Sequence, residues 1–299
     1  MSMPKLLYHY APIEAFKGII ESESMRMTKY DQMNDPLEVE HARNIVISIL
    51  KKYKCQPEHE SFRKYLIKGF DSYKDLNLFI SSFSEKSNYL EQWRAYTPNG
   101  GVAIGFDFSA LDKGFIYEHF PDGNYIQERG IVEYPNGGAV SVRHPANLHK
   151  CKYCNSVAIK MVEKDIKSWF GDTSYAKMYD FLAKGGIPGS ELPENIFAAT
   201  LSRSIYNIIS ITKHSAYKGE KEWRWVNINP KPSQFTKRID EKNRLYVIGR
   251  IHLEECIKEV WMSPHGDKCT IRDVLELYKA NKKLSFRIYE SKIPYRLCE

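Results

Sequence analysis

The order of the expected elements constrains the fold of this chain more than any other feature of its sequence. Strand-like runs open the chain, helical patterns occupy residues 152–213, and strand-like runs return from residue 221. This order lacks the regular strand–helix–strand alternation of a doubly wound parallel sheet, so it predicts an α+β fold. Because neither a repeat nor a low-complexity linker divides the chain, we expect one composite domain, 1–299, with a helical insertion at 150–213.

Local patterns place the individual elements. Residues 5–10 alternate as a strand, and Pro12 suits the first turn of a helix that follows directly. Further helices are predicted near 34–54, 60–70 and 270–281, and further strands at 101–108, 129–134, 221–228, 244–249, 257–263 and 284–291. The stretch "NGGAVSVRHPAN", residues 136–147, is predicted to be a loop.

Composition narrows the class of protein. Lys and Arg number 44 against 37 Asp and Glu, and the net charge of +7 favours anionic partners, although a solvated basic surface is the alternative. The apolar runs are far shorter than the roughly 20 residues of a membrane span, and no signal peptide opens the chain. We therefore expect a soluble cytoplasmic protein without a membrane partner, whose six scattered cysteines are reduced.

Common catalytic motifs are absent from the sequence, including the phosphate-binding loop, the serine nucleophile elbow, the zinc-binding H-E-x-x-H and the dinucleotide G-x-G-x-x-G. The stretch "HPANLHKCKYC" gathers four metal-ligand side chains: His144, His149, Cys151 and Cys154. A structural zinc site usually draws on a second Cys pair, which is missing here, so we predict incidental loop residues and no metal, with chelation of a soft metal ion as the alternative.

Two carboxylates stand out in "YKGEKEWRWVNI", residues 217–228. On a strand, Glu220, Glu222 and Arg224 share one face, because successive side chains alternate. Such a pair is able to hold sugar hydroxyls and to stabilise positive charge at an anomeric carbon. The alternative is an exposed strand face on which Glu222 pairs with a neighbouring cation.

The stretch "LFISSFSEKSNYLEQWRAYTPNGGVAIGFD", residues 78–107, places serines beside aromatic residues, whereas a simple core element needs few hydroxyls. Either Trp93 and Tyr96 pack a helix on the sheet while the serines satisfy backbone groups, or the group binds a ligand. His9 lies between Tyr8 and Tyr10 on the first strand, and its role is also undecided between packing and ligand binding. A lone histidine in such a place is commonly a hydrogen-bonded core residue.

Six separated blocks resemble a widespread bacterial family known mainly as a domain of unknown function (number twenty-nine seventy-one). The resemblance runs from about residue 6 to 296 and leaves 140–210 uncovered; its blocks are "LLYHYAPIEAFKGIIES", "MTKYDQMNDPLE", "FISSFSEKSNYLEQWRAYTPNGGVAIGFD", "YKGEKEWRWV", "VWMSP" and "ESKIPYR". The family usually has Thr at the position of Ala11, so one hydroxyl near His9 is lost. In "NDPLE", Asn34 and Asp35 are expected to form a turn and a helix N-cap.

That family in turn resembles the ADP-ribosyltransferase fold, including DarT-like toxins that modify nucleic acid, and some members are associated with phage defence. The resemblance implies a mixed or antiparallel sheet core and NAD as substrate. Carried over by position, the NAD-binding residues become His9, Tyr10, Ser84, Trp93 and Tyr96, with Arg224 on a phosphate or the carboxylates. It also implies that Glu222 stabilises an oxocarbenium-like ribose while Glu220 orients or deprotonates the acceptor.

Three functions remain open from the sequence. The first is an NAD-consuming ADP-ribosyltransferase-like effector, or an NAD glycohydrolase, in phage defence or a toxin–antitoxin system, with a nucleic acid or a protein as acceptor. The second is a sensor module that binds a nucleotide or nucleic acid without turnover, which a salt-bridged Glu222 favours. The third is a metal-dependent nuclease that uses carboxylates converging on a cation, namely Asp31, Asp35, Glu38 and Glu40.

Overall fold

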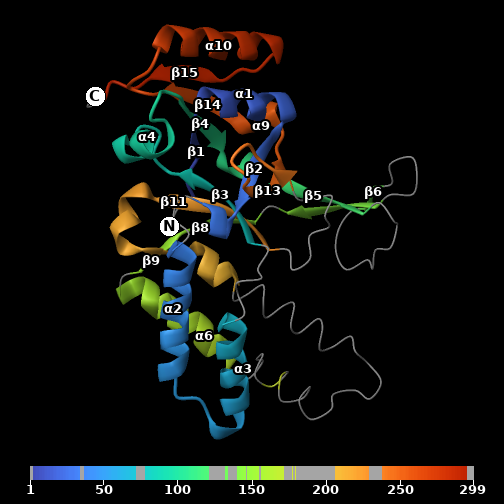
Figure 1. Ribbon diagram of the computed structural model, residues 1–299, viewed down its shortest axis with the longest axis vertical. Helices are drawn as coiled ribbons and strands as arrows, with labels where there is room; N and C mark the ends of the chain where they lie inside the picture. The colour runs from blue at the N-terminus through green and yellow to red at the C-terminus, as the bar shows by residue number, and fades with distance from the viewer. Residues whose placement is uncertain are drawn as a thin grey trace.

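The fold combines a large sheet with helices packed on both of its faces, as the computed structural model shows (Figure 1). The structure describes residues 3–33, 37–71, 78–120, 132–133, 140–145, 147–154, 156–171, 177, 179, 206–228 and 238–294. Within these residues, 13 strands form one sheet in which only β14 and β15 pair in parallel, and β9 and β10 form a separate parallel pair. The predicted α+β class is confirmed, with a mixed and largely antiparallel sheet.

The elements follow one another along the chain in an irregular order. The strands are β1 Leu6–Ala11, β2 Ser24–Lys29, β3 Leu78–Ser84, β4 Val102–Asp107, β5 Phe115–Phe120, β6 Val132–Glu133, β7 Val140–Pro145, β8 Asn147–Lys150, β9 Lys152–Cys154, β10 Thr212–His214, β11 Glu222–Ile228, β12 Arg238–Ile239, β13 Leu245–Arg250, β14 Ile257–Met262 and β15 Arg287–Glu290. The α-helices are α1 Ile13–Ser22, α2 Leu37–Lys52, α3 Glu60–Asp71, α4 Leu90–Tyr96, α5 Phe108–Leu111, α6 Ser156–Trp169, α9 Leu253–Cys256 and α10 Lys268–Asn281. The short 3-10 helices are η1 Tyr30–Gln32, η2 Pro57–His59 and η4 Ser215–Glu220, and residues 206–211 are also helical.

Most predicted elements are present, with several differences. The predicted loop at 136–147 is wrong over Val140–Pro145, which forms β7 and pairs with β5; the Gly-rich start of the stretch hid a β-prone run. The strand predicted at 129–134 is described only as β6. Six further strands were not expected from the pattern, namely β2, β5, β8, β9, β10 and β12. Inside the expected insertion, α6 and residues 206–211 are helical, whereas 180–205 lie outside the described residues.

Strand β3 is the junction of the sheet. Strand β11 pairs with β3 along its whole length, from Glu222 opposite Ser84 to Ile228 opposite Leu78. Strands β1 and β2 therefore share the other edge of β3, where β1 pairs only at Tyr8–Ser84 and β2 pairs at Thr28–Ile80 and Lys29–Phe79. This arrangement brings the N-terminal strand and β11 to opposite edges of one short segment.

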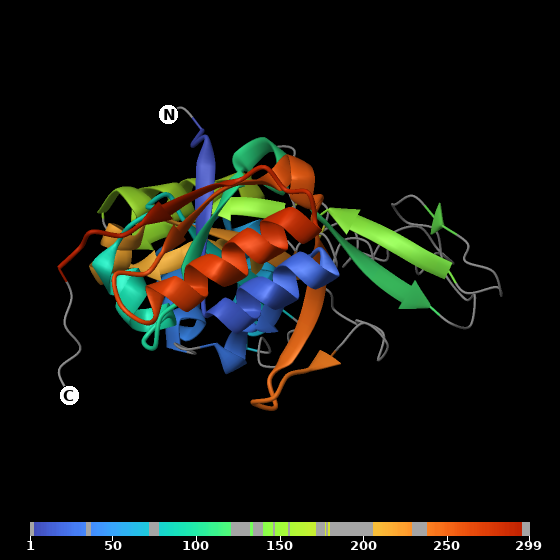
Figure 2. The ribbon, with the colours of Figure 1, turned by 90° about the horizontal axis from the view of Figure 1, so that it is seen from above.

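Two hydrophobic cores lie on opposite faces of the sheet. One face packs against α1 and α10, which lie side by side over the sheet in Figure 2, and its core includes Phe16, Ile104, Trp223 and Trp225. The other face packs against α2, α3 and α6, which form the lower lobe in Figure 1. Helix α1 buries the apolar side chains that its sequence spacing predicted and ends at Glu23, which adopts a left-handed conformation with φ of 50°.

The indole ring of Trp225 leaves no room for a side chain at Gly249. A Cβ atom at Gly249 would lie 2.8 Å from Trp225 Cζ3, and the ring is fully buried. We expect Gly249→Ala to lower the free energy of unfolding by about 1–3 kcal/mol, because overpacking displaces a rigid ring. Urea unfolding measures this effect.

Gly18 provides the matched control for Gly249. It lies in helix α1, and a Cβ atom there meets nothing within 4 Å. Gly18→Ala should therefore raise the free energy of unfolding by about 0.5–1 kcal/mol through helix propensity. Equal destabilisation by both substitutions would contradict the tight packing around Trp225.

Candidate functional site

Three elements bring charged side chains together at the start of β11. Strand β11 supplies Glu222 and Arg224, the turn before it supplies Glu220, and β10 supplies Lys213. Lys221 links η4 to β11 in a left-handed conformation with φ of 48°, and this reversal directs Glu220 and Glu222 toward the same space. The sequence prediction that these two carboxylates share a space is met, although Glu220 lies before the strand rather than on it.

Ion pairs join five side chains into one buried group, which we call the charge cluster: Glu38, Lys213, Glu220, Glu222 and Arg224. Lys213 Nζ lies 2.9 Å from Glu38 Oε1 and 2.5 Å from Glu220 Oε2, and it also donates to Glu222. Glu38 comes from the first turn of α2, far away in the sequence. The cluster thus ties α2, β10, η4 and β11 together.

Arg224 is held on all sides. Its Nε donates to Glu222 Oε1 at 2.7 Å, one terminal nitrogen donates to the carbonyl of Ser210 at 2.7 Å, and the other donates to Glu38. Only 1% of Arg224 is exposed. A buried guanidinium is tolerated only when its donors are satisfied, and here two carboxylates and a carbonyl satisfy them.

The two carboxylates of the η4–β11 turn differ in their pKa. Burial alone would raise the pKa of Glu222, but the charges and hydrogen bonds of Arg224 and Lys213 outweigh it and hold the pKa at about 2. Burial raises the pKa of Glu220, and the carboxylates of Glu222 and Glu38 add to this rise although Lys213 opposes it. Glu222 is therefore a fixed negative charge, whereas Glu220 takes up a proton more readily.

Tyrosines border the cluster. The ring of Tyr217 lies 4.8 Å from Lys213 Nζ, and Tyr217 is 38% exposed. Tyr96 is 36% exposed, and burial of its hydroxyl together with the charge of Glu222 raises its pKa to about 12. The hydroxyl of Tyr153 accepts a hydrogen bond from the backbone N–H of Glu222 at 2.6 Å. Polar aromatic groups therefore surround the charges on the side that approaches solvent.

Ser84 acts as a structural link next to the cluster. Its hydroxyl donates to the carbonyl of Glu220 at 2.6 Å and accepts from the backbone N–H of Lys86 at 3.0 Å. These bonds fasten the turn before β11 to the end of β3. The serines were expected either to satisfy backbone groups or to bind a ligand. The contacts of Ser84 agree with the first interpretation.

His9 does not join the cluster. Tyr8, Ser84 and Glu222 lie in one row across β1, β3 and β11, so their side chains share a face of the sheet, and His9 points to the opposite face. The ring of His9 lies 5.8 Å from that of Phe83, and its Nδ1 donates to the carbonyl of Ser82 at 2.9 Å. Burial lowers the pKa of His9.

Tyr10 and Trp93 pack against each other beneath α4. Their rings make an edge-to-face contact with centroids 4.7 Å apart, and Trp93 is fully buried. The Tyr10 hydroxyl donates to the carbonyl of Lys86 at 2.7 Å and accepts from the backbone N–H of Tyr89 at 3.0 Å, while Trp93 Nε1 donates to Asn88 at 2.8 Å. Of the three aromatic residues that the resemblance assigned to NAD, namely Tyr10, Trp93 and Tyr96, it is Tyr96 whose pKa is raised by burial and by the charge of Glu222.

Lys213 was not predicted from the sequence to belong to the site. The residue follows an apolar helical run, and nothing in its neighbourhood along the chain shows that it meets three carboxylates. Glu38 was considered only for a nuclease, yet its carboxylate contacts Lys213 and Arg224 instead. A lysine directly after an apolar run was the available signal, because an unpaired buried ammonium is costly.

Potential metal ligands are spread apart. Asp31 pairs with Lys29 at 2.7 Å, and Asn34 and Asp35 lie outside the described residues. Across the part of the chain that the structure describes, no three His, Cys, Asp or Glu side chains are placed to hold a metal ion. Cys151 is buried, and its backbone N–H donates to the carbonyl of Glu222 at 2.9 Å.

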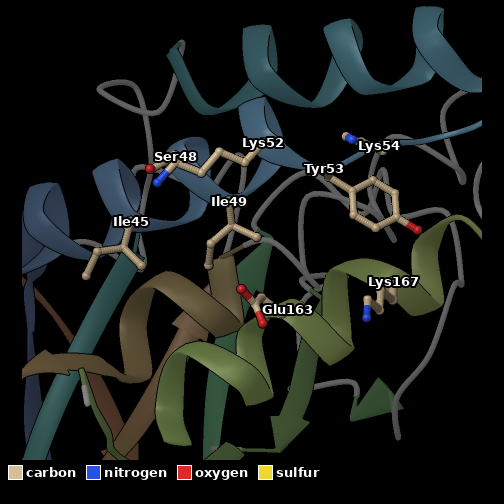
Figure 3. A pocket seen from close by; sticks show the side chains of 8 residues that line it. All are labelled: Ile45, Ser48, Ile49, Lys52, Tyr53, Lys54, Glu163 and Lys167. Carbon is tan, nitrogen blue, oxygen red and sulfur yellow. The ribbon is translucent and has the colours of Figure 1, made fainter. Parts of the chain in front are cut away.

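A cavity of about 540 Å³ lies between α2 and α6, away from the charge cluster (Figure 3). Its lining combines apolar and basic side chains: Ile45, Ser48, Ile49, Lys52, Tyr53, Lys54, Glu163 and Lys167. In Figure 3 the three lysine side chains extend in different directions and do not converge on one point. The cavity therefore has no evident centre for binding an anion.

Comparison with known proteins assigns no activity to the chain. Residues 92–225 match the model of a family described as "Protein of unknown function (DUF2971)". This match includes β10, η4 and the part of β11 that carries Glu222 and Arg224. Neither the search of curated proteins nor the search of solved structures returned a match. No described helix is long and apolar enough to cross a membrane.

Proposed function

Residues 92–225 match the model of the family of proteins of unknown function DUF2971, and on the geometry of the charge cluster we propose that this protein consumes NAD. In this proposal the protein cleaves the bond between nicotinamide and ribose and transfers ADP-ribose to water, to a nucleic acid or to a protein. An effector role in phage defence or in a toxin–antitoxin system is part of the proposal.

The observation that carries the proposal is the opposite shift of two neighbouring carboxylates. Glu222 stays ionised with a pKa of about 2, whereas the pKa of Glu220 is raised. Pairs of carboxylates whose environments separate their pKa values commonly divide the roles of electrostatic stabiliser and proton acceptor. The two residues lie on either side of Lys221 and contact the same ammonium group.

The chemistry follows from these charges. When the bond between ribose C1′ and the nicotinamide nitrogen breaks, its electron pair stays on nicotinamide, which leaves as a neutral molecule. The positive charge that develops on the ribose is stabilised by ionised Glu222. The acceptor oxygen then bonds to C1′ and gives its proton to Glu220. Tyr96, whose pKa is raised by burial and by the charge of Glu222, rather than the buried Trp93 supplies an aromatic side chain beside these charges.

Release of nicotinamide from NAD tests the proposal. We expect Glu222→Gln to reduce the rate of release about 100-fold, because an isosteric amide keeps the shape but removes the charge that stabilises the transition state. Chromatography of the reaction mixture, with and without DNA, RNA and protein as acceptors, measures the rate.

Glu85→Gln is the matched control. Glu85 is also a carboxylate at the end of β3, but it pairs with Lys150 at 2.5 Å and accepts from Trp223 outside the cluster. Its amide variant should keep the wild-type rate, and thermal unfolding checks that both variants are folded at the temperature of the assay. Absence of release from the wild-type protein with every acceptor would refute the proposal.

The second candidate is a sensor that binds a nucleotide without turnover. It is favoured by the salt bridges that engage both oxygens of Glu222, with Arg224 on one and Lys213 on the other. A carboxylate held in this way contributes to a rigid binding site even if it never meets a reacting atom. Calorimetric binding of NAD without any release of nicotinamide supports this candidate over the enzyme.

A further inference from the structure

Lys213 occupies a site that is built to hold a positive charge. Its ammonium group contacts carboxylates from three separate elements, namely Glu38 of α2, Glu220 of η4 and Glu222 of β11. The face of the Tyr217 ring lies 4.8 Å from the same nitrogen. Carboxylates combined with an aromatic face are the surroundings in which proteins bind ligand cations.

Lys213 is the cation of the cluster that is able to withdraw. Arg224 lies deeper, and its planar guanidinium is fixed by Glu222, Glu38 and the carbonyl of Ser210. An ammonium group on a flexible four-carbon stem, in contrast, moves without breaking a planar network. Glu220, one of its partners, has a side chain that is 20% exposed, which places the approach from solvent on the side of Lys213.

The charges of the cluster leave an excess of one negative charge, because three carboxylates face two cations. If Lys213 moves outward, the excess negative charge at the position of its ammonium group increases. Burial of uncompensated carboxylates is costly. A positively charged ligand group entering this place removes that cost, whereas a neutral group does not. The site therefore selects a ligand by its charge.

We infer that Lys213 holds the place of a ligand cation, and that the charge cluster recognises NAD through its positively charged pyridinium ring. This inference rests on the proposed function, because it takes NAD as the ligand. On binding, Lys213 yields its contacts with Glu220 and Glu222 to the ligand, while Arg224 keeps the two deeper carboxylates in position.

Oxidised and reduced dinucleotides provide the test, because they share their shape and phosphates while only the oxidised ring is cationic. We use the carbocyclic analogue of NAD, in which a methylene group replaces the ribose oxygen and prevents cleavage, in both redox forms. Calorimetric titration of the full-length protein should give at least about a tenfold tighter Kd for the oxidised form.

A second measurement uses Lys213→Met, which removes the internal cation and keeps the length of the side chain. We expect its Kd for the oxidised analogue to fall severalfold relative to wild type, while its Kd for the reduced analogue stays unchanged. Lys150→Met is the matched control, because Lys150 pairs with Glu85 and is 44% exposed outside the cluster. Thermal unfolding verifies that both variants fold. The comparison of the oxidised and reduced analogues on the wild-type protein does not depend on either variant.

The outcomes separate the inference from the proposed function. Equal affinity of wild-type protein for the two redox forms overturns recognition by charge and leaves NAD as the ligand. No binding of either form overturns both the inference and the proposed function. Tighter binding of the oxidised form, strengthened in Lys213→Met, supports the inference whether or not nicotinamide is released from NAD itself.

Discussion

Replacing Arg224 by methionine is expected to lower the free energy of unfolding by about 3–5 kcal/mol, the largest effect that we expect from a single substitution. The guanidinium is 1% exposed and neutralises both Glu222 and Glu38. Methionine fills a similar volume, so the loss comes from two buried carboxylates that keep only Lys213 as partner and from the unpaired carbonyl of Ser210. Urea unfolding monitored by tryptophan fluorescence measures the change.

Arg26→Met is the control for Arg224→Met. Arg26 also lies on a strand of the same sheet, but its side chain is 56% exposed and its ion pair with Glu241 spans 3.3 Å in solvent. Loss of an exposed pair of this kind should change the free energy of unfolding by less than about 1 kcal/mol. If both substitutions had the same small effect, the charge cluster would not stabilise the fold.

Acid should remove about 3 kcal/mol of stability through Glu222 alone. The pKa of Glu222 is about 2 in the folded protein and lies near 4.3 in an unfolded chain. Because the folded pKa is the lower one, the unfolded state binds the proton first. The stabilising contribution is therefore complete above about pH 5 and is lost as the pH falls toward 2.

The free energy of unfolding measured between pH 7 and pH 3 checks this expectation. The acid slope should be steep in the wild-type protein and shallower in Glu222→Gln, whereas the exposed variant Glu254→Gln should keep the wild-type slope. Glu220 acts in the opposite direction, because its raised pKa makes the folded state bind a proton more readily. An unchanged acid slope in Glu222→Gln would show that this carboxylate is not held ionised by Arg224 and Lys213.

The fold class and most elements were predictable because they depend on local patterns. Apolar spacing placed α1 and α10, alternation placed β1, β4, β11 and β14, and the lack of strand–helix alternation indicated an α+β fold. The strand at Val140–Pro145 was not predicted, because it depends on pairing with β5 and local spacing does not reveal that pairing. The pairing of Glu220 with Glu222 was also visible, since one residue separates them along the chain.

Only the tertiary structure decided which charges meet. Lys213 and Glu38 reach the cluster from distant parts of the chain, because α2 packs against β10 and both elements form ion pairs with β11. The structure also separates residues that the resemblance had grouped. The register of β1 on β3 turns His9 to the face opposite Glu222, since neighbouring positions on a strand point to opposite sides. The sequence alone thus determined the elements and the carboxylate pair, whereas the register and packing of the sheet determined their partners, because contacts between distant segments are absent from local spacing.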